Sequence, residues 1–161
     1  MSNTSNFMTD IYSNTIYILA RNAFQKSPRR FESDENFILE NRMIRIDGGR
    51  RTGKTRGLSS FVRMIEGKEE FSGRDVLYIS YGTEAFTKHL YNVERTVITK
   101  VAKKRAIQNE LYWERIGKLN NPIIIFDEPF ERMDYYTVID HIVKHTLYDD
   151  QYPLIVVIGM Q

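Results

Sequence analysis

Short apolar runs alternate along this chain with segments of helical periodicity. Each run holds four or five residues, is rich in β-branched side chains, and is followed closely by glycine or aspartate. Such runs are typical of strands that are buried on both faces of a parallel sheet. The predicted strands are residues 43–46, 76–80, 123–126 and 154–158.

Three segments between these runs carry apolar residues at helical spacing. They are residues 54–66, 84–118 and 135–148. In the first, Phe61, Val62 and Ile65 share one stripe with Leu58. The second is long, and its pattern leaves open whether it forms one helix or two. The third carries apolar residues at positions 138, 139, 142, 143 and 147.

This alternation predicts an α/β fold, a three-layer sandwich around a mostly parallel sheet. We assign residues 41–161 to the core and treat residues 1–40 as an appendage packed on it. Within the appendage, residues 15–24 fit an amphipathic helix or an edge strand, and residues 26–36 resemble a linker. Arg45 lies in the first core strand and indicates some exposure there, because an unpaired buried arginine is costly.

Composition limits the functional classes that fit. The chain has 161 residues, 42% of them hydrophobic, which suits one globular domain. The net charge is only +2, so anion binding must come from a local cluster. Cysteine is absent, which excludes disulfides and thiolate metal sites. We see neither a membrane-spanning stretch nor a signal peptide, and expect a cytoplasmic protein that makes no membrane contact.

The strongest motif follows the first predicted strand and precedes the first predicted helix. Gly48, Gly53, Lys54 and Thr55 match the P-loop pattern G-x-x-x-x-G-K-[ST] in that context. Glycines let successive backbone N–H groups converge on phosphate oxygens, and the helix N-terminus favours the same anion. Lys54 would reach the β- and γ-phosphates, and Thr55 would ligate Mg²⁺.

The motif therefore predicts ATP and Mg²⁺ as cofactors. A chance glycine turn before Lys-Thr is the alternative reading. The predicted nucleotide-binding residues are Gly48, Gly49, Arg50, Arg51, Thr52, Gly53, Lys54, Thr55 and Arg56.

Paired carboxylates end the strand at residues 123–126. Asp127 and Glu128 would lie at the carboxyl edge of the sheet, where open α/β sheets bind ligands. Asp127 would hold Mg²⁺, and Glu128, turned to another side, would orient and deprotonate a water. A solvated acidic turn is the alternative.

Together, the P-loop, the apolar strand and Asp127-Glu128 resemble the additional-strand, catalytic-glutamate division of P-loop NTPases. The stretch "GGRRTGKT" is similar to the ATPase domain of phage terminase large subunits. The resemblance covers roughly residues 42–161. It implies the spatial strand order 43–46, 154–158, 123–126, 76–80, and a cis arginine finger at Arg50 or Arg51.

The resemblance also implies a sensor residue after the last strand, where Gln161 stands. The sequence shows neither the fifth strand nor the trans arginine finger that are usual in this division. We therefore interpret the chain as a minimal or truncated core. The N-terminal segment, a second copy or a partner subunit would complete it. A viral protein of this class would act in the bacterial host cytoplasm.

Two further clusters offer alternatives. Lys100, Lys103, Lys104 and Arg105 form a basic cluster with Tyr112 and Trp113 nearby, which could track nucleic acid, DNA rather than RNA. His141, His145 and Asp149 recur at intervals of four; a metal site would need another ligand, and a solvated helix face is the simpler reading.

The leading functional hypothesis is an ATPase that drives motion on nucleic acid, as in DNA packaging. A nucleotide or small-molecule kinase is the first alternative, and it would not need Glu128. A nucleotide-gated binding module with little turnover is the second.

Overall fold

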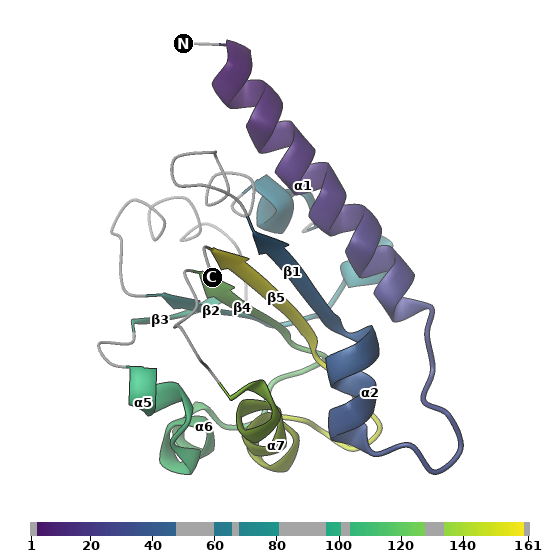
Figure 1. Cartoon of the computed structure of the whole chain (residues 1–161), viewed down its shortest axis with the longest axis vertical. Helices are drawn as coiled ribbons and strands as arrows, with labels where there is room; N and C mark the ends of the chain where they lie inside the picture. Colours follow the sequence, from purple (N-terminus) through teal and green to yellow (C-terminus); the bar gives the residue numbers. More distant parts are fainter. Residues whose placement is uncertain are drawn as a thin grey trace.

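A sheet of five parallel strands forms the middle of the fold, in the order β1-β5-β4-β2-β3 (Figure 1). The structure is a computed structural model, and it describes residues 3–47, 60–65, 68–80, 96–100, 104–127 and 134–159. Parallel neighbours require crossover connections, so the fold belongs to the mixed α/β class. The strands are β1 (Met43–Asp47), β2 (Val76–Ser80), β3 (Thr96–Lys100), β4 (Ile123–Asp127) and β5 (Leu154–Gly159).

The order expected for four strands is confirmed, and the fifth strand corrects two expectations. β3 lies at the edge of the sheet beside β2, so residues 96–100 are not helical and a fifth strand is present. The run Thr96-Val97-Ile98-Thr99 is wholly β-branched, which favours a strand over the helix that wider spacing suggested. Farther along, the segment does form helices, α5 (Lys104–Ile107) and α6 (Glu110–Ile116).

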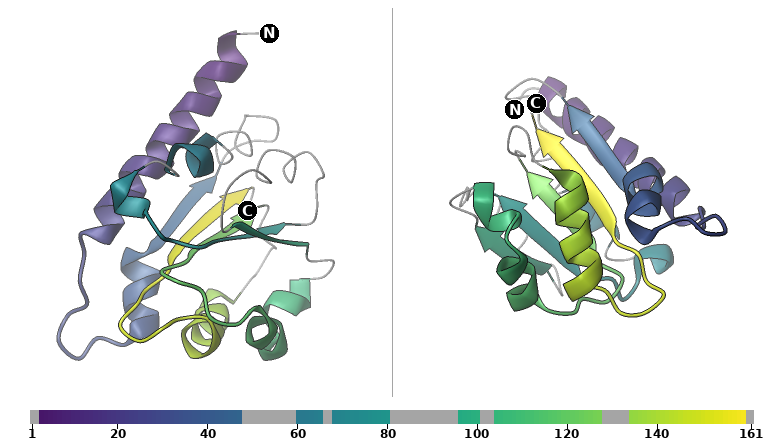
Figure 2. Two further views of the ribbon diagram at one scale, coloured as in Figure 1. Left: turned by 180° about the vertical axis from the view of Figure 1, so that it is seen from behind. Right: turned by 60° about the horizontal axis from the view of Figure 1, so that its bottom comes forward.

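Helix α1 (Asn3–Phe24) and residues 60–65 cover one face of the sheet (Figure 2). Ile16 and Ala20 of α1 are fully buried against this face, together with Phe61 and Val62. The ring of Phe71, in the short helix η1 (Glu69–Phe71), joins them. Its centroid lies 5.8 Å from Tyr17, 5.3 Å from Phe24 and 6.1 Å from Phe61.

Helices α2 (Asp34–Asn41), α6 and α7 (Tyr135–His145) cover the opposite face. Val138, Ile139 and Ile142 of α7 are buried, which confirms the helix expected there. Trp113 of α6 is also fully buried, and its indole N–H donates to the carbonyl of Ile107 at 2.6 Å.

The N-terminal region resolves one open choice. Residues 15–24 belong to the 22-residue helix α1 rather than to an edge strand. The expected linker at 26–36 is shorter than predicted, because α2 begins at Asp34 with Ser33 as its N-cap. Ser33 Oγ accepts a hydrogen bond from the backbone N–H of Asn36, a pairing that the sequence reading missed.

A polar clamp ties the loops at the amino ends of the strands. Asp75 Oδ2 accepts from the backbone N–H of Asn120 at 2.7 Å, and Gln151 Nε2 donates to Asn120 Oδ1 at 3.0 Å. Gln151 Oε1 accepts in turn from the backbone N–H of Asn121 at 2.8 Å. These bonds join the residues that precede β2, β4 and β5, so the clamp holds the strand starts together.

Within the described ranges, no helix combines the length and the apolar character that crossing a bilayer requires.

The N-cap of α7 gives a stability prediction. Asp134 accepts from the hydroxyl and the backbone N–H of Thr137, and these bonds lower its pKa below the ordinary value of 3.8. Asp134→Ala should lower the free energy of unfolding at pH 7 by about 1 kcal/mol, measured by urea denaturation.

The pH dependence follows from the sign of that shift. The contribution of an ionised Asp134 is complete above the unfolded-state pKa and is lost as the pH falls through the lower folded-state value. The difference between wild type and Asp134→Ala should therefore shrink below about pH 4. Ser33→Ala removes an uncharged N-cap and should show no such change; equal pH profiles would contradict the assignment.

Candidate functional site

The carboxyl ends of β1 and β4 lie along the same edge of the sheet, with β5 between them. Asp127 of β4 is aligned with Ile158 of β5, and Ile158 is aligned with Ile46 of β1. Two strand spacings separate Asp127 from Ile46, or about 10 Å between backbones. The carboxyl ends of β4 and β1 therefore lie near each other at this edge.

Asp127 is the described member of the acidic pair, and it is a buried carboxylate with 6% of its surface exposed. Strand alternation gives it the same face as Ile123 and Ile125, the face covered by α1 and residues 60–65. The hydroxyl of Tyr78, on the neighbouring strand β2, donates to Asp127 Oδ2 at 2.5 Å. This bond fixes the orientation of the carboxyl group at the strand end.

Tyr78 reaches Asp127 because of its register. Tyr78 is aligned with Ile125, two residues before Asp127, so its side chain lies on the same face and extends toward the carboxyl edge. Tyr78 is 1% exposed, and a buried phenol requires a hydrogen-bond partner. Sequence reasoning missed this residue. The available signal was the single aromatic residue of the strand "VLYIS". In the observed register, strand alternation puts it on the same face of the sheet as Asp127.

The chemistry of Asp127 fits a hard cation such as Mg²⁺. Mg²⁺ is held by one or two carboxylates and completes its coordination with water and substrate phosphate. Within the part of the chain that the structure describes, no group of three histidine, aspartate or glutamate side chains is close enough to hold a metal. A cation at Asp127 would therefore draw its other ligands from the segments beside this edge, from water or from a bound substrate.

All of the predicted nucleotide-binding residues, and every other predicted site residue except Asp127, lie outside the described part of the chain. These are residues 48–56, which include Lys54 and Thr55, together with Glu128 and Gln161. Their predicted roles stay predictions. The structure does show what flanks them: the motif segment follows β1 and is followed by helical residues 60–65, which pack on the face that carries Asp127.

Arg45 and Tyr135 meet near the same edge, on the opposite face. The guanidinium carbon of Arg45 lies 4.5 Å from the ring centroid of Tyr135, the first residue of α7. Arg45 is exposed, as the sequence predicts. Stacking on a ring in this way stabilises the arginine without a carboxylate.

The prediction that Tyr112 and Trp113 could stack on nucleic-acid bases is wrong for Trp113. Trp113 is fully buried and cannot stack on a base, while half-buried Tyr112 packs edge-on against it at 5.1 Å. Lys103 lies outside the described residues, as do the side chains of Lys100, Lys104 and Arg105. The backbone shows that Lys100 ends β3 and that Lys104 begins α5.

The two histidines of α7 join helices, which corrects the solvated-face reading. His141 Nε2 lies 3.1 Å from the carbonyl oxygen of Gln108, and His145 Nε2 lies 2.9 Å from Glu110 Oε1. The hydrogen bond with His145 lowers the pKa of the Glu110 carboxyl. These contacts tie α7 to α6 and to the turn before it.

Comparisons with protein-family models, curated proteins and solved structures returned no significant match to this chain. A function for this chain therefore has to be inferred from the motif and from the geometry of the sheet edge.

The Tyr78–Asp127 bond gives a second prediction. Tyr78→Phe leaves the buried carboxylate without this donor and should lower the free energy of unfolding by about 1–3 kcal/mol. Urea denaturation in the presence of EDTA measures the effect without bound cations.

A double-mutant cycle provides the control. In the background of Asp127→Ala, Tyr78→Phe should cost much less, because the charged acceptor is already gone. Additive effects of the two substitutions would show that the bond does not couple these residues.

Proposed function

We propose that this chain binds Mg·ATP and hydrolyses it. The observation that carries the proposal is the order β1-β5-β4, with Asp127 aligned through Ile158 to Ile46. This arrangement brings the end of the acidic strand to the edge from which the Gly48–Thr55 motif departs. A P-loop and a metal-binding aspartate have to share such an edge.

Each residue of the site would have a separate task. Backbone N–H groups of residues 48–53 and the Lys54 ammonium would hold the phosphates, while Thr55 and Asp127 would hold Mg²⁺. Mg²⁺ in such sites neutralises charge on the β- and γ-phosphates. Glu128 would orient a water for attack, and Arg50 or Arg51 would stabilise the charge that develops.

Strand alternation supports this division between the two acids. The side chain of Asp127 lies on the face covered by residues 60–65, the helical segment that follows the motif. If the strand direction continues by one residue, Glu128 turns to the other face. One carboxylate would then be available for the metal and the other for a water.

The strand order also supports a P-loop NTPase sandwich of the catalytic-glutamate division. In that division the strand that follows the acidic strand lies between it and the P-loop strand, as β5 does here. We extend the proposal to a terminase-like motor that acts on nucleic acid, DNA rather than RNA, in the cytoplasm. Lys100, Lys103, Lys104 and Arg105 would contribute cationic contacts, and a second copy or a partner subunit could supply a trans arginine.

The central test uses Glu128→Gln and Lys54→Ala. We expect Glu128→Gln to bind ATP normally and to lose at least about 100-fold in phosphate release, because it removes only the general base. Lys54→Ala should lose ATP binding itself. Glu114→Gln, an exposed glutamate on α6, serves as the matched control and should keep full activity.

The same assays separate the competing functions. Phosphoryl transfer that survives Glu128→Gln would identify a kinase. ATP binding by the wild type without turnover would identify a nucleotide-gated binding module. Phosphate release measured with single- and double-stranded DNA and RNA, at several protein concentrations, would show the polymer and any need for assembly.

A further inference from the structure

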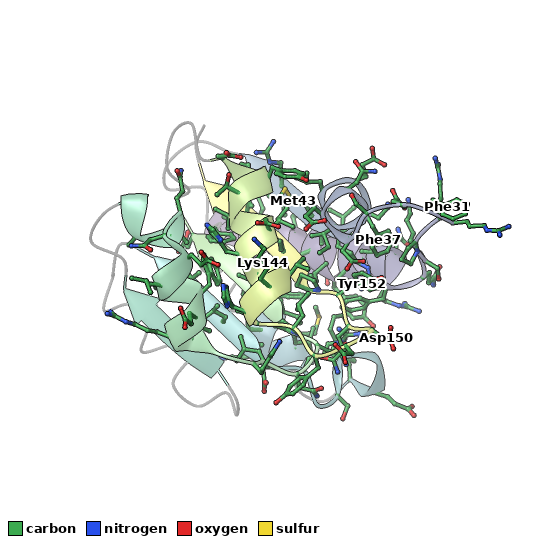
Figure 3. All side chains as sticks on the ribbon, turned by 90° about the horizontal axis from the view of Figure 1, so that it is seen from below. Phe31, Phe37, Met43, Lys144, Asp150 and Tyr152 are labelled. Carbon is green, nitrogen blue, oxygen red and sulfur yellow. The ribbon has the colours of Figure 1, made fainter. Side chains whose placement is uncertain are left out.

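The turn between α1 and α2 presents an aromatic side chain to solvent. Phe31 is 93% exposed and extends away from the body of the protein (Figure 3). Its backbone adopts φ 69°, in the left-handed region that non-glycine residues rarely occupy. A large apolar side chain that is exposed and held in an unfavourable backbone conformation makes this turn a candidate for a binding role.

Hydrogen bonds fix the conformation of this turn. Glu32 Oε1 accepts from the backbone N–H of Arg29 at 3.1 Å, and Glu32 Oε2 accepts from Asn36 Nδ2 at 2.9 Å. The backbone N–H of Glu32 donates to the carbonyl of Arg29, also at 3.1 Å. Both carboxyl oxygens of Glu32, the residue after Phe31, are therefore engaged in hydrogen bonds to the flanking residues.

Both ends of the segment are anchored in the protein. After the turn, Phe37 of α2 is fully buried, and its ring meets that of Tyr152 edge-on at 4.9 Å. At the start of the turn, Arg42 Nη2 donates to the carbonyl of Lys26 at 3.4 Å. A turn held in this way loses little conformational entropy when it binds a ligand.

The charged side chains that precede Phe31 in the turn are all positive, and the Glu32 carboxylate follows it. Lys26, Arg29 and Arg30 are exposed, and the guanidinium carbon of Arg30 lies 5.1 Å from the centroid of the Phe31 ring. Across the described ranges, no carboxylate lies within ion-pair distance of Arg29 or Arg30. Guanidinium groups bind phosphates through paired N–H donors and also stack on flat rings.

We propose that this turn, residues 26–31, binds single-stranded nucleic acid. Phe31 stacks on an unpaired base, and Lys26, Arg29 and Arg30 contact the flanking phosphates. A duplex keeps its bases stacked on one another and offers no free base face to a single exposed ring.

An anionic membrane is the competing partner, and the surroundings disfavour it. Lipid-binding basic clusters hold about four to eight cations, whereas this turn holds three. Asp34 and Glu35 begin α2 beside the turn, and a flat anionic surface would meet them as well. A single-stranded oligonucleotide is narrower and can contact Lys26, Arg29 and Arg30 without meeting these acids.

The proposal deepens the nucleic-acid part of the proposed function and rests on that part alone. The turn lies by the amino ends of the strands, across the sheet from the carboxyl edge (Figure 1). Binding can therefore be measured without ATP, and in the Lys54→Ala variant. Loss of ATPase activity with retained oligonucleotide binding would separate the two proposals.

The experiment measures fluorescence anisotropy of a labelled oligo-dT with the full chain. Phe31→Ala should weaken binding by roughly tenfold, while Tyr136→Ala, which removes an exposed aromatic on α7, should not.

The double variant Arg29→Gln/Arg30→Gln should reduce the slope of log affinity against log salt by about 1.4. In Phe31→Trp, indole fluorescence should be quenched by the oligonucleotide, since buried Trp113 provides only a constant background.

Phe31→Gly separates stability from binding. Glycine accepts a positive φ, so this variant should have a melting temperature no lower than that of the wild type. Its affinity for the oligonucleotide should nevertheless fall, because the aromatic ring is gone. Unchanged affinity in Phe31→Ala, equal affinity for a duplex, or binding to phosphatidylserine vesicles without binding to oligo-dT would each overturn the proposal.

Discussion

Strand β5 pairs in parallel with both β1 and β4, and this pairing positions the other elements of the sheet. β5 is joined on either side by continuous registers, and its residues from Leu154 to Ile158 are buried. A strand in this position must satisfy backbone hydrogen bonds on both edges and bury side chains on both faces. It thereby sets how far apart, and at what level, the ends of β1 and β4 lie.

The same pairing explains where a charged group can stand in an otherwise apolar layer. β4 is buried along its whole length, and polarity enters only at its last residue, Asp127. A buried carboxylate needs hydrogen-bond donors, and Tyr78 supplies one from the adjacent strand. The carboxyl group of Asp127 is thus held by the sheet itself.

The two edges of the sheet differ in character. At the amino edge, Asp75, Asn120 and Gln151 bond to one another and to nearby backbone, and they also line a pocket of about 530 Å³ together with Tyr148. Because these polar groups are engaged in joining loops, we assign them a structural role. At the carboxyl edge, Asp127 is the last residue of β4. The motif segment follows β1, which ends at the same edge. The proposed phosphate chemistry belongs there, and the turn that carries Phe31 provides a separate surface.

Four of the five strands, β1, β2, β4 and β5, could be read from the sequence alone. So could the helical character of residues 60–65 and 135–145, and the glycine motif with its acidic partner. Strands buried on both faces leave continuous apolar runs, and phosphate-binding loops need glycine at fixed spacing, so both can be read locally. Three features became visible only in the fold: residues 96–100 form an edge strand, Trp113 is buried, and Tyr78 donates a hydrogen bond to Asp127. An edge strand is partly solvated, so its pattern also fits a helix. The burial of an aromatic and the partner of a carboxylate depend on segments distant in the chain, which no local window contains.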